Sequence, residues 1–346
     1  MPPPPPSHPS QPAPLPRIIT YYQTHRKANN EPISILPLAT PPSATHVILA
    51  ALHVNKEPEN LSLNDDPVDS PRYTTLWAEL RILQASGVKV LAMLGGAAPG
   101  TYQRLDGSQQ AFETYYAPLR RLISHRNLDG LDLDVEEETS LNGIMRLIDR
   151  LRNDFGPGFI ITLAPVAAAL LDSKSNLSGF DYEALEVLRG SDIAWYNAQF
   201  YCGWGDLSST YMYDLILAKG WHPSKIVIGL VTNPANGKGF VPWSLLEPVL
   251  AHIMKRHPRD FGGVMGWEYF NSLPGNDCRP WEWARQMATL LKPGHHALPS
   301  SAIQAPLSTP SPAVASNHVV DPDEAGGHPL PLPAPFDYVS DQDEQS

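Results

Sequence analysis

The segment DGLDLDVE occupies residues 129–136 of the chain. Polar and apolar side chains alternate in it with a period of two, which predicts a β-strand. Asp132, Asp134 and Glu136 would then lie on one face of the strand, with apolar side chains on the other. Because like charges in a row repel one another, at least one of these carboxyls should have a raised pKa. A carboxyl that keeps its proton near neutral pH is what a general acid needs.

An acidic strand also allows two other interpretations. One is a solvated edge strand with a charged face, which the following residues, Glu137 and Glu138, slightly favour. The other is a metal site, because an Asp-x-Asp-x-Asp run suits Mg²⁺ or Ca²⁺. A calcium loop, however, needs a turn-forming glycine in its middle and a later glutamate ligand, and the segment has neither. We therefore predict no metal and no other cofactor.

The composition divides the chain into three parts. Nine of the 37 prolines lie in residues 1–16, and residues 295–346 are rich in proline and acidic residues. Both ends lack apolar periodicity, so we expect disordered tails there. Residues 17–294 suit one large domain with the size of an α/β barrel.

Charge and hydropathy exclude several classes of protein. The formal net charge is −11 and no basic run is interleaved with aromatic residues, so we expect no nucleic-acid partner. No run of 18 or more apolar residues is present, and we expect no membrane span. The start of the chain does not have the pattern of a signal peptide. These features together favour a cytoplasmic protein, which we expect to be a monomer.

The two cysteines, Cys202 and Cys278, do not have the spacing of a zinc site or of a disulfide-rich scaffold. They follow the sixth and eighth predicted strands, so they could meet at one rim of a barrel. Disulfide geometry is demanding, however, and free thiols are the expectation for an intracellular protein.

Short apolar runs alternate with longer amphipathic ones across the central part of the chain. The predicted strands are 18–22, 46–53, 88–94, 128–135, 159–165, 193–201, 225–231 and 263–269. Helices are predicted at 75–86, 109–125, 141–155, 182–188, 211–219, 242–256 and 281–291, with Ser108 and Ser140 placed to cap two of them. Eight strand–helix alternations predict a (β/α)₈ TIM barrel. The alternative is a doubly wound open sheet, but the chain has no glycine-rich phosphate turn.

Polar and aromatic residues gather where the predicted strands end, which is where a barrel carries its chemistry. Glu136 ends the fourth strand. Other strand ends carry Tyr21, Gly95, Gly96, Asn197, Gln199, Tyr201 and Trp267. Aromatic rings stack on sugar rings and amides bind hydroxyls, so we expect these residues to line a sugar site. The alternative for any single aromatic is packing in the core.

Residues 129–136 resemble the Asp-Gly-x-Asp-x-Asp-x-Glu signature of glycoside hydrolase family 18 without departure. Longer segments resemble the fungal endo-β-N-acetylglucosaminidases of that family: VKVLAMLGGAAPG at 88–100, FIITLAPVAAAL at 159–170, SDIAWYNAQFY at 191–201 and GGVMGWEYFNSLPGNDCRPWEW at 262–283. The resemblance implies a retaining enzyme that cuts the bond between the two core GlcNAc residues of N-glycans. The implied partner is therefore an N-glycan or a GlcNAc oligomer.

The resemblance also implies roles for individual residues. Glu136 would protonate the leaving glycosidic oxygen. Asp134 would orient the substrate's 2-acetamido group and share a proton with Asp132, while Tyr201 would bond the acetamido carbonyl. Trp267 would floor the −1 subsite, with Tyr21 near it and Gln199 on the same face as Tyr201. Family 18 uses the substrate's own acetamide in place of a second carboxylate nucleophile, through an oxazolinium ion.

The chain departs from the family pattern in two places. Glu137 and Glu138 add negative charge after Glu136, and our hypothesis is that this charge raises the pKa of Glu136. Cys202 follows Tyr201 where many bacterial-type chitinases have another residue pair, which mildly disfavours that branch. A chitinase with the same mechanism remains the alternative function, and the proline-rich tails do not suit a module that binds solid chitin. A non-catalytic lectin on the same barrel ranks lower, because the acidic residues and the tyrosine are all present.

Overall fold

Eight of the apolar runs form parallel strands in the computed structural model, which describes residues 15–39 and 43–292. They are β1 (Arg17–Tyr22), β2 (His46–Val54), β5 (Lys89–Gly95), β6 (Gly130–Asp134), β7 (Ile160–Leu163), β8 (Trp195–Gln199), β9 (Ile226–Val231) and β10 (Gly263–Trp267). Each strand pairs in parallel with the next, and β1 pairs with both β10 and β2, which closes the sheet. The predicted TIM barrel is therefore confirmed, and the open doubly wound sheet is wrong.

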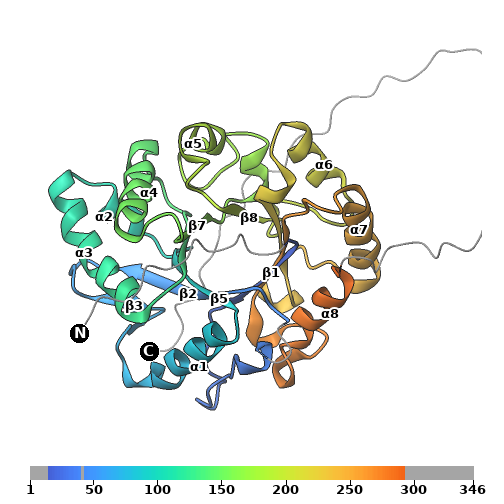
Figure 1. Ribbon diagram of the computed structural model, residues 1–346, viewed down its shortest axis with the longest axis horizontal. Coiled ribbons are helices and arrows are strands. Elements are labelled where there is room, and N and C mark those ends of the chain that lie inside the picture. The colour runs from blue at the N-terminus through green and yellow to red at the C-terminus, as the bar shows by residue number, and fades with distance from the viewer. Residues whose placement is uncertain (1–14, 40–42, 293–346) are drawn as a thin grey trace, which may run out of the picture. The chain divides into compact units, whose positions relative to one another are not determined.

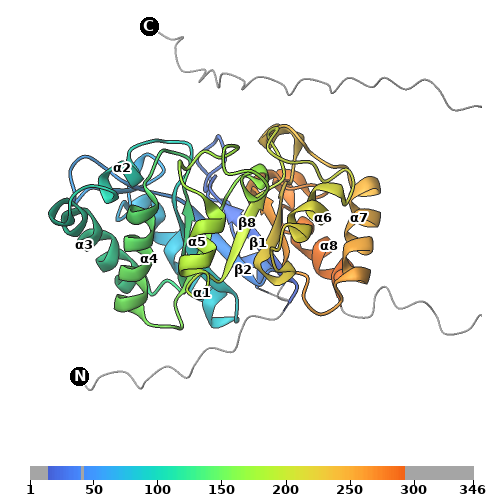
Figure 2. The ribbon, with the colours of Figure 1, turned by 90° about the horizontal axis from the view of Figure 1, so that it is seen from above.

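Helices surround the strands, as Figure 1 shows. They are α1 (Thr74–Ala85), α2 (Thr101–Leu105), α3 (Gln109–Arg126), α4 (Leu141–Phe155), α5 (Tyr182–Arg189), α6 (Tyr211–Ala218), α7 (Trp243–Arg256) and α8 (Glu282–Leu290). In the perpendicular view of Figure 2, α3 and α4 lie on one side of the central strands, and α7 and α8 lie on the other. The expected caps are present, since the side chain of Ser108 accepts from the amide of Ala111 and that of Ser140 from the amide of Gly143. No helix among the described residues is long and apolar enough to cross a bilayer.

Several short elements were not predicted. The strands β3 (Leu61–Leu63) and β4 (Asp66–Pro67) extend β2 as an antiparallel ribbon, and α2 fills the connection after β5. Short 3₁₀ turns lie at Leu36–Leu38, Pro71–Tyr73, Ala167–Leu170, Pro223–Lys225, Pro234–Asn236, Tyr269–Asn271 and Asn276–Cys278. The tails expected at 1–16 and 295–346 fall outside the described residues, apart from Leu15 and Pro16.

Alternation along each strand produces two separate cores. On β6, Leu131 and Leu133 belong to the layer between the barrel and the helices, where both are fully buried. The barrel interior is filled by a second cluster: Ile19, Tyr21, Ile48, Ala50, Ala51, Leu91, Met93, Trp195, Tyr201, Val227, Val231 and Met265. Asp132 and Asp134 alternate with the two leucines and are buried as well, so their carboxyls lie on the interior side. The predicted strand is confirmed, and the solvated edge strand is wrong because β6 pairs on both sides.

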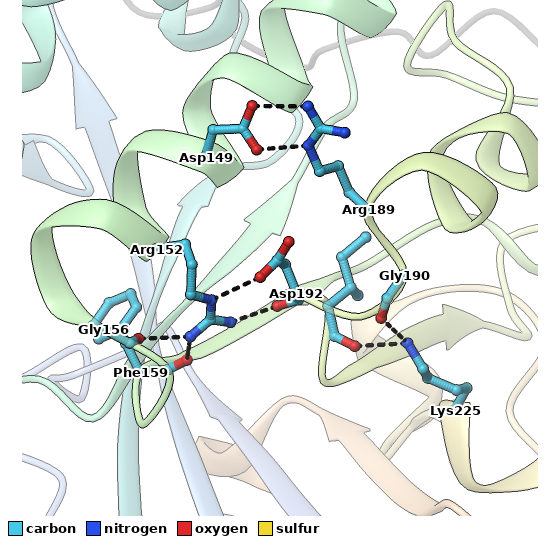
Figure 3. Close-up of polar contacts among 9 residues, drawn as sticks. Asp149, Arg152, Gly156, Phe159, Arg189, Gly190, Asp192 and Lys225 are labelled. Carbon is cyan, nitrogen blue, oxygen red and sulfur yellow. Dashed lines mark hydrogen bonds and ion pairs between the residues drawn. The ribbon is translucent and has the colours of Figure 1, made fainter.

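Charged side chains join the loops at the amino ends of the strands, as Figure 3 shows. Arg152, in the last turn of α4, donates to the carbonyl oxygens of Gly156 (2.7 Å), Phe159 (2.9 Å) and Asp192 (2.6 Å). Its Nε also lies 3.1 Å from the carboxylate of Asp192. One guanidinium therefore holds together the segments that lead into β7 and β8.

Two further contacts extend this network (Figure 3). Arg189 binds the carboxylate of Asp149 with two parallel hydrogen bonds of 2.5 and 2.9 Å, which joins α5 to α4. Lys225, just before β9, donates to the carbonyl oxygens of Gly190 (2.6 Å) and Ile193 (2.7 Å). The amino ends of the strands in a TIM barrel serve stability, whereas the carboxyl ends carry the chemistry.

We expect Arg152→Met to lower the free energy of unfolding by about 2 kcal/mol, because it leaves several partly buried carbonyl oxygens without a donor. Urea unfolding at neutral pH measures the change. Arg121→Met is the matched control, since Arg121 pairs with Glu59 where the two side chains are 56% and 77% exposed. Exposed pairs contribute little, so the control should stay within about 0.5 kcal/mol of the parent. Equal losses in both variants would contradict the structural role of Arg152.

Candidate active site

Three carboxyls follow β6 from the barrel interior to its carboxyl end. Asp132 has no exposed surface and Asp134 is 6% exposed. Glu136 lies two residues beyond the strand and is partly exposed. Of the three, the outermost carboxyl is therefore the one best placed to meet a ligand from solvent.

Asp132 receives hydrogen bonds from three other strands. The hydroxyl of Tyr21 on β1 donates to Oδ2 (2.6 Å), and the amide of Asn197 on β8 donates to Oδ1 (2.9 Å). The hydroxyl of Thr162 on β7 also donates to Oδ1. Burial raises the pKa of Asp132, while these three donors act in the opposite direction because they favour the charged form.

The side-chain amide of Gln199 connects the other two carboxyls. Its Nε2 lies 3.3 Å from Oδ1 of Asp134, 3.2 Å from Oε1 of Glu136 and 2.9 Å from the carbonyl oxygen of Ala164. A carboxamide has two N–H hydrogens, and here it meets three acceptors. One hydrogen serves the carbonyl oxygen of Ala164, which leaves one for Asp134 and Glu136. The two carboxyls therefore compete for one donor, and a proton on either of them relieves the competition.

Burial is the main cause of the raised pKa of both outer carboxyls. It raises the pKa of Asp134 well above the ordinary value, and the neighbouring carboxyls Glu136 and Asp132 raise it further. Burial also raises the pKa of Glu136, and the hydrogen bond from Gln199 lowers it. The sequence-based expectation had the right direction, but it attributed the effect to charge repulsion, which comes second to the loss of water for Asp134 and is not among the causes for Glu136.

Tyr201 lies two residues beyond β8, with its ring in the interior cluster. Its hydroxyl has no hydrogen-bond partner in the part of the chain that the structure describes. Burial raises the pKa of Tyr201 well above its ordinary value, and Asp134 and Glu136 add to the effect. The hydroxyl therefore stays protonated and can donate to a ligand beside the two carboxyls.

Aromatic and glycine residues complete the site at the ends of β10 and β5. Trp267 is partly exposed, and its ring centroid lies 5.6 Å from that of Tyr21 at an interplanar angle of 60°. Gly95 and Gly96 have φ values of +91° and +93°. A Cβ on Gly95 would lie 2.5 Å from the carbonyl oxygen of Asp134, so only glycine lets β5 pass so close to β6. The structure thus places all ten sequence-predicted site residues either in the barrel interior, as for Asp132 and Asn197, or at the carboxyl end of the strands.

Two supporting residues were not recognised from the sequence. Thr162 is the register partner of Asp132 across β6 and β7, and it is a polar residue in an otherwise apolar run. Trp195 donates from its indole nitrogen to Oδ1 of Asn197 (2.9 Å), which fixes the amide that binds Asp132. A polar residue on the inner face of a buried strand was the signal that could have identified Thr162.

The structure does not support the hypothesis that Glu137 and Glu138 raise the pKa of Glu136, because neither is among the causes of that shift. The carboxylate of Glu137 is buried and accepts hydrogen bonds from the backbone amides of Gly100 and Tyr102, both at 2.7 Å. It therefore holds the start of α2, and burial accounts for the raised pKa of Glu136.

No group of acidic, histidine or cysteine residues that could hold a metal occurs within the described ranges. Cys202 and Cys278 are exposed free thiols, as expected.

The raised pKa of Asp134 predicts a pH-dependent cost to stability. A carboxyl with a raised pKa in the folded state stabilises the protein most at low pH, and this stabilisation is lost as the pH rises through the folded-state pKa. Asp134→Asn removes the buried charge, so it should raise the free energy of unfolding by about 1 kcal/mol at pH 8. The gain should disappear at pH 4, where the parent carboxyl is protonated.

Urea unfolding at both pH values measures this difference. Asp69→Asn is the control, because the side chain of Asp69 is 77% exposed. A gain for Asp134→Asn that is the same at pH 8 and pH 4, or a loss at pH 8, would contradict the assignment of a buried charge.

Comparison with known proteins agrees with this geometry. The sequence model of the glycosyl hydrolases family 18 matches residues 17–240. The chain is 50% identical to a fungal endo-β-N-acetylglucosaminidase from glycosyl hydrolase family 18, with a TM-score of 0.78 over 81% of this chain and 99% of that one. It is 55% identical to the chitinase ChiC of Aspergillus fumigatus, with a TM-score of 0.73 over 80% and 100% of the two chains.

A more distant relative is Chitinase 2 of Rhizopus oligosporus, which is 30% identical over 209 residues. The match covers 55% of this chain and only 36% of the length of that relative.

Proposed function

The chain belongs to glycosyl hydrolase family 18, and from this premise we propose that it is a retaining endo-β-N-acetylglucosaminidase. Its substrate would be the bond between the two core GlcNAc residues of N-glycans. The observation that carries the proposal is that Gln199 bridges the buried Asp134 and the partly exposed Glu136 beside Tyr201, whose pKa is raised by burial and by both carboxyls. The similarity to the fungal endo-β-N-acetylglucosaminidase over nearly its whole chain supports the choice of substrate.

Glu136 would act first as the general acid. Burial raises its pKa, which favours the protonated form that can give a proton to the leaving glycosidic oxygen. After the leaving group departs, the same carboxylate would accept a proton from water in the second step. An acid whose pKa lies close to the working pH can serve in both directions.

Asp134 and Tyr201 would hold the substrate's acetamide, which replaces a protein nucleophile. The acetamide oxygen would attack the anomeric carbon, and the ring that forms is an oxazolinium ion. Asp134 would accept from the acetamide N–H and stabilise the developing positive charge, while the Tyr201 hydroxyl would donate to the acetamide oxygen and orient it.

Asp132 would act from inside the barrel. It has no exposed surface and is held by Tyr21, Thr162 and Asn197, so it does not touch the substrate. Its proximity raises the pKa of Asp134. A proton shared between the two aspartates would move toward Asp132 when Asp134 takes the acetamide hydrogen bond.

Chitin oligomers are the second candidate substrate, because the chain is 55% identical to the chitinase ChiC. Both candidates require a GlcNAc with its 2-acetamido group on the non-reducing side of the cleaved bond, and the same residues would act on both. A lectin that binds without cleavage is disfavoured by the presence of the acid Glu136 and the acetamide-binding pair Asp134 and Tyr201.

Mass spectrometry separates these functions. A high-mannose glycoprotein incubated with the protein should fall to the mass of the polypeptide plus one GlcNAc. Glu136→Gln should lower the rate at least about 10³-fold, because the amide cannot donate a catalytic proton, while substrate binding is kept. Shortening of chitin oligomers alone would make the protein a chitinase, and full activity of Glu136→Gln would refute the assigned acid.

The pH profile tests the contact between Gln199 and Glu136. The amide favours the ionised carboxyl and lowers the pKa of Glu136, so its removal should raise that pKa. In Gln199→Met the basic limb of kcat/KM should therefore move to higher pH, and kcat should fall about tenfold as Asp134 loses its donor. Gln84→Met is the control, because Gln84 donates to Asn127 and Asp129 away from the site. A basic limb that stays in place or moves to lower pH would contradict the contact.

A further inference from the structure

Glu268 is a buried carboxylate that the mechanism above does not use. It follows Trp267 directly at the end of β10 and is 6% exposed. Its Oε2 accepts from the backbone amides of Gln23 (3.1 Å) and Thr24 (2.8 Å), and its Oε1 accepts from the hydroxyl of Thr24 (2.9 Å). One side chain thus binds the segment after β1 at three points.

The Glu268 carboxylate joins β1 and β10 beyond the point where the pairing of the two strands ends. The parallel pairing of β1 with β10 extends to Thr20 and Gly266 and stops one residue before Tyr21 and Trp267. Beyond that point, the Glu268 side chain joins the two strand ends. Tyr21 and Trp267 are the two aromatic residues whose rings meet at the site, with centroids 5.6 Å apart.

The other side of the β10 end is held by the loop after β9. The carbonyl oxygen of Trp267 accepts from the amide of Thr232 (2.8 Å) and from the side chain of Asn236 (3.3 Å). The carbonyl oxygen of Glu268 accepts from the hydroxyls of Thr232 (2.7 Å) and Ser272 (2.8 Å). The backbone at the end of β10 is therefore fixed by the loop after β9 and by Ser272 in the segment after β10, so that the carboxylate is anchored when it binds the segment after β1.

Tyr21 links the segment that Glu268 binds to the acidic strand β6. The hydroxyl of Tyr21 donates to Asp132, and Asp132 in turn raises the pKa of Asp134. A shift of the end of β1 would therefore change the position of the Tyr21 ring relative to Trp267 and of the Tyr21 hydroxyl relative to Asp132. Burial raises the pKa of Glu268, so the fold bears the cost of a desolvated carboxyl at this place.

We propose that Glu268 is a positioning residue, which fixes Tyr21 and Trp267 relative to one another by binding Gln23 and Thr24. This inference rests on the proposed function, because the two aromatics are assigned to the sugar site there. The length of the Glu268 side chain determines the relative position of the two aromatics, and its charge does not. A glutamine of the same length can accept from both backbone amides with its oxygen, and it can donate to the Thr24 hydroxyl with its NH₂ group.

Two variants separate the effect of the length of the Glu268 side chain from the effect of its charge. Glu268→Gln keeps the length and loses the charge, whereas Glu268→Asp keeps the charge and is shorter by about 1.5 Å. On the substrate that the parent cleaves, we expect Glu268→Gln to keep kcat within about threefold of the parent. Glu268→Asp should lose about 10²-fold in kcat with a smaller change in KM, because a misplacement of about 1 Å costs that much.

Glu79→Asp is the matched control. Glu79 on α1 accepts from the amide of Ile35 (2.9 Å) and the hydroxyl of Ser34 (3.0 Å), in the same connection between β1 and β2, and neither contact involves Tyr21 or Trp267. Its shortening should lower the free energy of unfolding as Glu268→Asp does and leave kcat within twofold of the parent. Glu268→Asp with the kcat of the parent, or Glu268→Gln as impaired as Glu268→Asp, would overturn the proposal.

A second readout does not depend on catalysis. The indole N–H resonance of Trp267 can be assigned by its loss in Trp267→Phe. It should shift or broaden in Glu268→Asp and stay in place in Glu268→Gln and Glu79→Asp. If the parent cleaves neither glycans nor chitin oligomers, the proposed function fails and this resonance still decides the positioning role. An unmoved resonance in Glu268→Asp would overturn that role.

Discussion

The structure depends on the burial of carboxyls along one strand of a closed barrel. Asp132 and Asp134 are removed from water, which costs several kcal/mol for an ionised carboxylate unless donors or a proton compensate. The donors to Asp132 come from Tyr21, Thr162 and Asn197 on three different strands. The shorter path from β1 to β6 runs through β2 and β5 and has three strand spacings of about 4.8 Å. In a flat sheet the two strands would therefore lie about 14 Å apart. Closure of the barrel brings the Tyr21 hydroxyl to 2.6 Å from Asp132.

The same constraint links stability to the proposed chemistry. Removal of water raises the pKa of Asp134 and Glu136, which favours the protonated form that a general acid needs. The carboxyl ends of the strands therefore carry groups that disfavour the folded state at neutral pH. The amino ends carry the compensating contacts, in which Arg152 and Lys225 bind the carbonyl groups of the loops that lead into the strands. Chemistry and stability thus occupy opposite ends of the barrel.

Much of this arrangement could be predicted from the sequence, because period-two alternation and helix caps are local signals. All eight barrel strands and seven of the eight described helices were predicted, and so was the end of the barrel where Glu136 lies. The five residues of α2 and the three of β3 were missed because they are too short to show a period. The partners of Glu268 could not be predicted, since Thr24 lies 244 residues away along the chain. The leading cause of the raised pKa of Glu136 was also misjudged, because burial depends on all the neighbouring strands.

The titration of Glu136 tests the central claim most directly. Carbon-13 NMR of the side-chain carboxyls, with the Glu136 signal assigned by its loss in Glu136→Gln, follows this group alone through the pH range. A burial-raised pKa predicts a midpoint above the ordinary value for glutamate, with protons exchanged between Glu136 and Asp134 visible as a second inflection. A single midpoint at or below the ordinary value would show an ionised carboxylate at neutral pH and would contradict its assignment as the acid.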